Sequence, residues 1–347
     1  MSWSIVHQIA KPRLSGIISH EIPDLGEEDE GFVLVKFLAA PINRVDLMVL
    51  AGQYPVKPRY LVNEEPVLGF DGCGVIVESK DPSLEPGDVI IPRELGLGTW
   101  RTHAVLPARS LLKLPGGTPP LAASLLRSSA VVAWLLLEEV TPLQKGDWII
   151  VSAGTSCVAQ FLAQIASRKG INAILVIRDR EGVSESKKAL LKLGAAKVIT
   201  ESELEVREGE LFQENLVLAI DSVFGDVGQR LVETLSPGGK YVLLGMLGGP
   251  AGSLAITTKH LFHRRLSLLP FRSSEVLSRL GTANADALFH KIARLLTDGS
   301  LKCPDVRIVD WAQGENDHTT LETIVQESLK TAESKDVGYQ KLVWNFQ

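Results

Sequence analysis

The chain has 347 residues, of which 45% are hydrophobic and 22% are charged, and its formal net charge is -5. This composition is that of an ordinary globular protein, and the length is enough for two domains. The acidic balance argues against binding to nucleic acid through overall charge. The three cysteines lie far apart and form no C-x-x-C pair, which argues against a disulfide framework and a structural zinc lobe. No apolar run approaches the length that a membrane span needs.

The first part of the chain has strand-like patterns separated by glycine and proline turns. Residues 32–37 form the clearest predicted strand, and residues 46–50 predict a short helix. Tyr54 follows in a loop rich in glycine and proline, where a tyrosine is more often a packing or surface residue than a catalyst. Asp71 and His103 are the only hints of a metal site in this half. Neither has partners at ligand spacing, so we interpret both as structural.

The middle of the chain predicts one βαβ unit of a doubly wound parallel sheet. A short β-branched run at 148–151 is followed by a turn of small residues at 152–156. Apolar residues at helical spacing then lead to Gly170, and a second apolar run covers 173–177. Strands and helices continue to alternate between about residues 128 and 273, which predicts an α/β domain with a Rossmann-type sheet.

The turn before the first helix of this unit is a predicted site for a dinucleotide. Ser156, Cys157 and Val158 lie where free N–H groups and the helix dipole favour a pyrophosphate. Arg178 is the first residue past the second strand, and Arg180 follows it. An arginine at this position accepts a 2′-phosphate, whereas an acidic residue favours a free hydroxyl. The sequence therefore favours NADPH over NADH.

Two later strands of the same domain also end in candidate cofactor contacts. Asp221 and Ser222 end one strand, and Gly245 and Met246 follow another, so we expect all four to line the nicotinamide side. Cys157 weakens the prediction, because it stands where the dinucleotide pattern has a glycine and would crowd the pyrophosphate. The alternative, an α/β unit that binds nothing, stays open at this point.

The segments outside the central domain complete the predicted organisation. Residues 121–140 have the pattern of one long apolar helix, and a further helix is expected at 285–296. The final strand, at 341–344, is expected to return to the first domain, whose strands need covering. These patterns predict a nucleotide-binding domain over 128–273 and a catalytic domain over 1–127 and 274–347.

Several motifs together resemble the medium-chain dehydrogenase/reductase superfamily. They are Asn43-x-x-Asp46, Gly69-x-Asp71-x-x-Gly74, Glu85-Pro86-Gly87-Asp88, the central βαβ unit and Leu193-Gly194-Ala195. Three stretches are most similar to the zinc-free branch of mitochondrial trans-2-enoyl-CoA reductases. They are residues 39–43 leading to Gly52-Gln53-Tyr54, residues 96–102, and residues 176–180.

The resemblance implies a Rossmann domain beside a mostly β GroES-like domain, with no metal and with NADPH as cofactor. It implies reduction of the double bond of a 2-enoyl thioester, linked to CoA or to acyl-carrier protein, as in mitochondrial fatty acid synthesis. In this reading Tyr54 gives a proton to the α-carbon, while Asn43 and Trp100 orient and wall the site. The resemblance also implies a mitochondrial homodimer that pairs through the strand at residues 266–269. The N-terminus has no clear presequence, and a cytoplasmic location is the alternative.

Three departures from the branch keep other functions open. Residues 128–131 replace a pattern that normally contacts the nicotinamide, Cys157 replaces a glycine, and residues 270–272 differ near the substrate pocket. One alternative is an NADPH quinone or enone oxidoreductase, although residues 96–102 argue against it. Another is a catalytically inactive member that acts as a binding or scaffold protein.

Overall fold

A computed structural model describes residues 1–7, 15–54, 56–206, 214–249, 251–311, 317–334 and 340–347. Pro55, which directly follows Tyr54, therefore lies outside the described residues. The chain forms two compact units: Met1–Ser128 with Asp286–Gln347 is unit 1, and Ser129–Ala285 is unit 2. None of the described helices combines the length and the apolar character that crossing a membrane requires.

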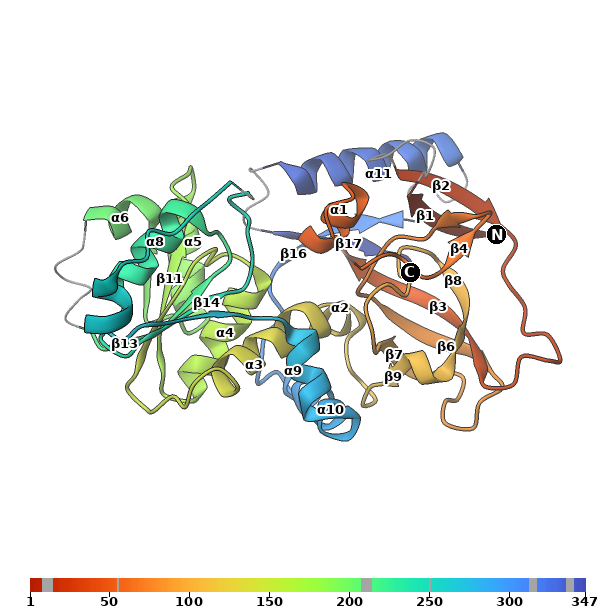
Figure 1. Ribbon diagram of the computed structural model, residues 1–347. Helices are drawn as coiled ribbons and strands as arrows, with labels where there is room; N and C mark the ends of the chain where they lie inside the picture. Colours follow the sequence, from red (N-terminus) through yellow and green to blue (C-terminus); the bar gives the residue numbers. More distant parts are fainter. Residues whose placement is uncertain (8–14, 55, 207–213, 250, 312–316, 335–339) are drawn as a thin grey trace. The chain divides into compact units, whose positions relative to one another are not determined.

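Unit 2 is built on a six-stranded parallel sheet (Figure 1), with the strand order β12-β11-β10-β13-β14-β15. The order is that of a doubly wound dinucleotide-binding sheet, which confirms the predicted α/β class. Its central strands are buried on both faces, as their continuous apolar runs require. The strands are β10 (Trp148–Val151), β11 (Asn172–Ile177), β12 (Lys197–Thr200), β13 (Leu216–Asp221), β14 (Lys240–Leu243) and β15 (Ser267–Pro270).

The helices of unit 2 connect these parallel strands, as a sheet of this kind requires. The expected helix after the first strand is confirmed as α4, and the later expected helices are α5 and α8. The described helices of this part are α3 (Val132–Glu138), α4 (Cys157–Arg168), α5 (Val183–Lys192), α6 (Glu201–Val206), α8 (Gly225–Thr234), the π-helical turn η3 (Lys259–His263) and α9 (Ser273–Leu280).

The expected single helix over residues 121–140 is wrong. The chain forms α2 (Pro120–Ser124), a π-helical segment η2 (Leu126–Val131) and then α3. Pro120 suits the start of α2, because a proline at the first helical position loses no hydrogen bond. Apolar spacing reports which residues are buried, and it does not report whether each N–H bonds four or five residues back. The sequence pattern therefore could not distinguish one helix from three short pieces.

Unit 1 is mostly β structure, as expected for a GroES-like domain. Its main sheet has the order β16-β17-β3-β6-β7-β9, with β8 also paired to β3, and two small sheets pair β1 with β2 and β4 with β5. The strands are β1 (Ser2–His7), β2 (Ser15–His20), β3 (Phe32–Pro41), β4 (Leu61–Val62), β5 (Glu65–Pro66), β6 (Cys73–Ser79), β7 (Val89–Pro92), β8 (His103–Pro107), β9 (Leu111–Lys113), β16 (Val306–Asp310) and β17 (Lys341–Asn345).

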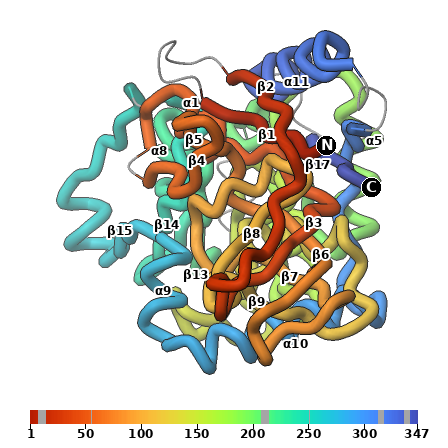
Figure 2. The backbone as a smooth tube through the Cα atoms, turned by 90° about the vertical axis from the view of Figure 1, so that its right-hand side faces the viewer, coloured from red at the N-terminus to blue at the C-terminus, as the bar shows by residue number. Residues whose placement is uncertain are grey.

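The last strand returns to the first part of the chain, as expected. β17 pairs antiparallel with the end of β3, where Val343 lies opposite Pro41, and Ile42 N–H donates to the Leu342 carbonyl at 2.9 Å. Figure 2 shows β17 beside β3 in the same layer. The remaining described helices touching this unit are α1 (Arg44–Leu50), the short 3-10 turn η1 (Ala108–Ser110), α10 (Thr282–Thr297) and α11 (His318–Glu333). The sequence pattern predicts α10, whereas α11 and β16 are not predicted from it.

Candidate functional site

The side chain of Asn43 lies at the centre of a polar network in unit 1. It stands between the end of β3 and the start of α1 and is 7% exposed. Its Nδ2 donates to Asp71 Oδ2 at 2.9 Å and lies 3.4 Å from Ser128 Oγ. Its Oδ1 accepts from Lys341 Nζ at 3.1 Å. Both ends of the amide are therefore held by groups from three other segments of the chain.

Asp46, the second residue of the Asn43-x-x-Asp46 motif, links the start of α1 to the segment before β6. Its Oδ2 accepts the Asn43 backbone N–H at 2.8 Å, and its Oδ1 accepts the Phe70 N–H at 3.0 Å. The residue is 1% exposed, and burial is the main cause that raises its pKa to about 8. The buried carboxyl thus satisfies two backbone donors that would otherwise lack partners.

Tyr54 lies just beyond the end of α1, where we expected it. Gly52 has φ +70°, and its conformation turns the chain out of the helix. The Tyr54 ring is half-buried and meets Phe70 in an edge-to-face contact, with ring centroids 6.1 Å apart. Among the described residues, no group forms a hydrogen bond with its hydroxyl. Since Phe70 is held by Asp46, the same network that fixes Asn43 supports the ring of Tyr54.

Trp100 is placed differently from the wall residue that we expected. Its side chain is completely buried in the core of unit 1, its Nε1 donates to the Pro41 carbonyl at 3.2 Å, and its ring meets Trp344 in an edge-to-face contact. A Cβ atom on Gly69 would lie 2.4 Å from Trp100 Cδ1, so the turn requires a glycine at position 69. The Trp100 side chain therefore packs against the turn at Gly69 and has no exposed surface for a ligand.

Asp71, which we predicted to be structural, is buried as deeply as Asp46. It is 1% exposed, and among the described residues its Oδ1 has no hydrogen-bond partner. Burial raises the pKa of its carboxyl, an effect opposed by the nearby Ser128 hydroxyl and by the Arg127 and Lys341 cations. His103 lies apart from this network and contacts Thr102 Oγ1 through Nδ1. No three His, Cys, Asp or Glu side chains of the described residues gather closely enough to hold a metal ion.

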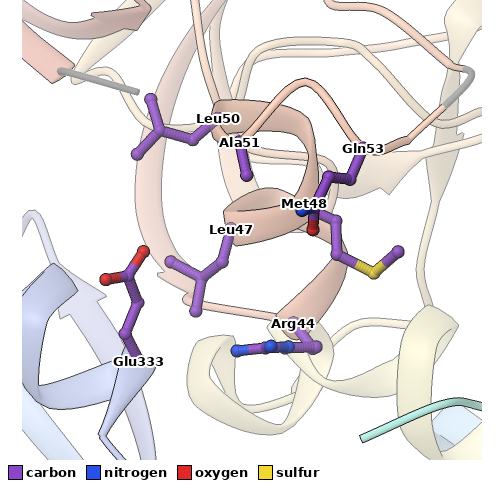
Figure 3. Close-up of a pocket in the computed structure, with 7 residues that line it drawn as sticks. All are labelled: Arg44, Leu47, Met48, Leu50, Ala51, Gln53 and Glu333. Carbon is purple, nitrogen blue, oxygen red and sulfur yellow. The ribbon is translucent and has the colours of Figure 1, made fainter. Parts of the chain in front are cut away.

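A hollow of about 420 Å³ lies along α1, the helix that separates Asn43 from Tyr54 in the chain. In Figure 3, Arg44 lies on α1 and Gln53 lies on the turn that follows it, while Glu333 lines the hollow from α11. The wall is completed by Leu47, Met48, Leu50 and Ala51. The hollow therefore adjoins both ends of the segment that holds the catalytic candidates.

In unit 2, the start of α4 has the features of a dinucleotide turn. Ser156 caps the helix, with its Oγ accepting from Ala159 N at 3.2 Å. A Cβ atom on Gly154 would lie 2.8 Å from Leu175 Cβ, so the turn packs closely on β11 and requires glycine there. Cys157 is the first residue of α4 and is 5% exposed, while Val158 is half-buried. The crowding of a pyrophosphate by Cys157 stays a prediction.

Asp221 is the best-satisfied buried charge of unit 2. Its Oδ1 accepts from Ser152 Oγ at 2.6 Å and Val223 N at 2.8 Å. Its Oδ2 accepts from Phe224 N at 3.0 Å and Tyr241 Oη at 2.6 Å. The residue is 0% exposed, so these four donors use the oxygens that a cofactor would otherwise meet.

The other candidates at this end of the sheet are brought together as expected. Ser222 donates its N–H to Ser152 Oγ at 2.8 Å, and a Cβ atom on Gly245 would lie 3.3 Å from the Ser222 carbonyl. Met246 follows and is 50% exposed. The ends of β13 and β14 thus form one edge, whose turn is shaped by Asp221 from inside.

The arginines after β11 lie at the predicted strand end. Arg178 directly follows Ile177 and is exposed, and Arg180 is half-buried. Asp179 between them accepts the Ser202 N–H at 3.0 Å, at the start of α6. Burial raises the pKa of Glu201 in the same helix, and Arg178 opposes that rise, so Arg178 lies beside an acidic neighbour.

Sequence reasoning missed three groups that organise these sites. Lys341 gave no signal, since it is one lysine at the start of a final strand. Ser152 and Tyr241 meet Asp221 only because β10, β13 and β14 are adjacent in the sheet. The glycines on both sides of Asp71 were the one visible sign that its carboxylate lies in a tight turn.

Comparison with known proteins places these features in a family. Residues 29–116 match the alcohol dehydrogenase GroES-like domain. The chain is 34% identical over 277 residues to the mitochondrial enoyl-[acyl-carrier-protein] reductase of Rattus norvegicus, covering 78% of this chain and 73% of the relative. It is 30% identical over 337 residues to the enzyme of the same name from Kluyveromyces lactis, covering 91% and 86%.

Solved structures agree with the fold. A mutant form of enoyl thioester reductase from Candida tropicalis has 24% sequence identity, a TM-score of 0.85 and 99% coverage of both chains. A mutant of Etr1p, solved in complex with NADP and crotonyl-CoA, has 25% identity with the same TM-score and coverage. The Rossmann-type sheet, the GroES-like domain and the similarity over most of the chain all agree with the resemblance drawn from the motifs. The chain belongs to the mitochondrial enoyl-[acyl-carrier-protein] reductase family of the medium-chain dehydrogenase/reductase superfamily.

Proposed function

We propose that the chain reduces the carbon–carbon double bond of trans-2-enoyl thioesters with NADPH, giving the saturated acyl thioester. The observation that carries this proposal is the family membership, with 34% identity over 277 residues to a reductase of this kind. The thioester is linked to CoA or to acyl-carrier protein. We place the reaction in mitochondrial fatty acid synthesis, because the relatives are mitochondrial enzymes.

The residues at the start of α4 fit the proposed cofactor. The helix α4 has twelve residues, and its capped N-terminus offers N–H groups to a pyrophosphate. Gly154 lets the turn before α4 lie close to the sheet. Ser156, Cys157 and Val158 would hold the pyrophosphate, and Arg178 with Arg180 would meet the 2′-phosphate. Ser222, Gly245 and Met246 would line the nicotinamide, while Asp221 acts through the turn that it shapes. NADPH, when bound, supplies the hydride for the β-carbon.

Tyr54 is the proposed proton donor. Charge that develops on the thioester oxygen makes the α-carbon basic, and a positioned phenol gives it a proton. A phenol has a pKa of about 10 in water, so orientation rather than acidity must make the transfer efficient. Its hydroxyl has no protein partner among the described residues, which leaves the proton available to a substrate. Asn43 orients the site from the other end of α1, and Trp100 acts by supporting the Gly69 turn.

We also propose a homodimer that pairs through β15. This strand is at one end of the six-stranded sheet, so one of its sides has no neighbour in the sheet order. Leu269 on this strand is 37% exposed, and nearby Phe262 is 78% exposed. Open strand edges are pairing sites, and an apolar edge favours a second copy. A monomeric mass in solution at micromolar concentration would contradict this proposal.

The experiment is NADPH oxidation by the purified protein with a medium-chain trans-2-enoyl-CoA. The Tyr54→Phe variant tests the donor, and Tyr60→Phe, another tyrosine of unit 1, is the matched control. Loss of a general acid should lower kcat by about 10² to 10⁴ in Tyr54→Phe and leave Tyr60→Phe near the wild type. NADH replaces NADPH in a third arm and should support much slower turnover.

The outcomes separate the three functions that the sequence left open. Turnover of the thioester that survives in Tyr54→Phe keeps the reaction and removes Tyr54 as donor. Activity on a quinone with none on the thioester replaces the proposal by a quinone reductase. No activity on either substrate, together with no NADPH binding by calorimetry, leaves a binding or scaffold protein.

A further inference from the structure

Lys341 is a cation whose nearest partners are neutral oxygens. Its Nζ donates to the Ile42 carbonyl at 3.2 Å and to Asn43 Oδ1 at 3.1 Å. The residue is half-buried at the first position of β17. Among the described residues it forms no salt bridge, although Asp46 and Asp71 are close enough for its charge to oppose the rise in their pKa values.

The orientation of the Asn43 amide follows from the groups at its two ends. An ammonium can only donate, so the atom that faces Lys341 must be the amide oxygen. Asp71 Oδ2 accepts from the amide nitrogen at 2.9 Å, in agreement with the orientation that the lysine requires. Turning the amide by 180° would place N–H against ammonium. Lys341 therefore admits one orientation.

The same contact polarises the amide. A positive charge at Oδ1 draws electron density from the amide group and strengthens its N–H donors, as happens in chains of buried hydrogen bonds. Those donors face Asp71 Oδ2 at 2.9 Å and Ser128 Oγ at 3.4 Å. Ser128 is half-buried, whereas Asn43 and Asp71 are buried. A change at Lys341 is thus transmitted through Asn43 to Asp71 and Ser128.

We propose that Lys341 is a positioning residue of the reductase site, which holds and polarises the Asn43 amide from the last strand of the chain. This inference rests on the proposed function, because it makes the rate of that reaction depend on a residue about 300 positions from Asn43 along the chain. A purely structural role is the competing explanation, in which the lysine only fastens β17 to residue 42. The β17 backbone makes its own bond there, from Ile42 N–H to the Leu342 carbonyl, and it remains when the lysine is replaced.

Lys341→Met is the test variant, since methionine keeps an unbranched apolar stem and loses the charge. Lys240→Met is the matched control: Lys240 is also half-buried, also begins a strand, and donates to the Val140 carbonyl at 3.0 Å in unit 2. We expect Lys341→Met to lower kcat by about 10- to 100-fold, as small displacements of a site do. The KM for NADPH should stay within about twofold, and Lys341→Arg, which keeps donors and charge, should recover part of kcat.

A second measurement is independent of turnover. The Asn43 side-chain amide is observed in ¹⁵N-edited NMR spectra, assigned by its loss in Asn43→Ser, and its solvent exchange is measured. Exchange should be at least about tenfold faster in Lys341→Met than in the wild type. In this variant the amide is held only at Nδ2, so its hydrogen bonds break more often. Lys240→Met should not change it.

Each outcome decides the inference. Lower kcat together with faster amide exchange, both absent in Lys240→Met, supports it. A change in only one of the two measurements, or equal effects in both lysine variants, overturns it in favour of a structural role. A wild-type protein that does not reduce the thioester ends the proposed function, and the exchange experiment then decides by itself whether Lys341 holds Asn43.

Discussion

Two buried aspartates show how differently the two units use the same side chain. Asp221 in unit 2 accepts four hydrogen bonds, from two hydroxyls and two backbone N–H groups. Asp71 in unit 1 accepts one bond from an amide at Oδ2, and its Oδ1 has no partner among the described residues. A carboxylate whose oxygens are all used is a structural support. One with an oxygen left over lies in a network that can still respond to a ligand.

The surroundings of the two aspartates extend this contrast. Asp221 shapes a turn from inside, and the cofactor candidates Ser222 and Gly245 lie on the outside of that turn. In unit 1 the candidate Asn43 is itself buried and is held by charges on both sides. We therefore expect changes in unit 2 to separate into stability effects inside and binding effects outside. In unit 1 stability and activity should change together.

The largest effect is expected for Asp221→Ala. The change leaves two hydroxyls and two backbone N–H groups without their acceptor, and each buried unsatisfied donor is costly. We expect the free energy of unfolding to fall by about 3 kcal/mol or more in urea titrations. Asp226→Ala, an exposed aspartate at the start of α8, is the control. Equal losses in the two variants would contradict the supporting role of Asp221.

Gly72→Ala tests how tightly the turn around Asp71 is packed. A Cβ atom there would lie 2.9 Å from Thr99 Cβ and 3.2 Å from the Ala39 carbonyl. Overpacking of this kind lowers the free energy of unfolding by about 1 to 3 kcal/mol. We expect kcat to fall as well, because Asp71 directly precedes Gly72 in the chain. Gly116→Ala, where a Cβ would meet nothing within 4 Å, should leave both unchanged. A stable Gly72→Ala variant with full activity would break the expected coupling of stability and activity in unit 1.

Arg178→Ala tests the outer, binding face of unit 2. The exposed arginine should contribute to affinity through the 2′-phosphate alone, so NADPH binding should weaken about tenfold and NADH binding should not change. Stability should stay within about 0.5 kcal/mol of the wild type. Lys192→Ala at the end of α5 removes an exposed positive charge elsewhere in the unit and serves as the control. Similar weakening of NADPH and NADH binding would remove Arg178 as the selecting residue.

The smallest effect concerns the pH dependence that Asp46 gives to unit 1. Burial raises its pKa to about 8, so between about pH 4 and pH 8 the folded chain binds one more proton than the unfolded chain. Its contribution to stability therefore falls as pH rises through this window and is constant above it. Asp71 and Lys341 face the same carboxyl and remain in the variant.

Asp46→Asn removes this titration. The difference in unfolding free energy between wild type and Asp46→Asn should change by at least about 1 kcal/mol across the window, in favour of the variant at high pH. Asp226→Asn, with its exposed side chain, serves as the reference. Parallel pH profiles for wild type and Asp46→Asn would mean that Asp46 is ionised in the folded chain throughout.

The sequence predicted the structure best where a prediction depends on one continuous segment of the chain. The alternating strands and helices of unit 2 follow from local pattern, because a buried parallel strand must be a continuous apolar run. The position of Tyr54 after α1 follows from a helix that ends at glycine. The three pieces between residues 120 and 138 were not visible, since hydrogen-bond register leaves no mark in apolar spacing.

Tertiary structure decided which partners meet. Residues 43, 71, 128 and 341 come from four segments, and they meet because β17 pairs beside β3 and the Gly69 turn packs against Trp100. Likewise, the donors of Asp221 come from β14 and from the residues that directly follow β10 and β13, and no local pattern contains the order of these strands. By itself the sequence determined most strands and helices of unit 2, the family and the candidate residues. Only the folded chain decided which charges are paired, because the energy of a buried charge depends on what surrounds it in space.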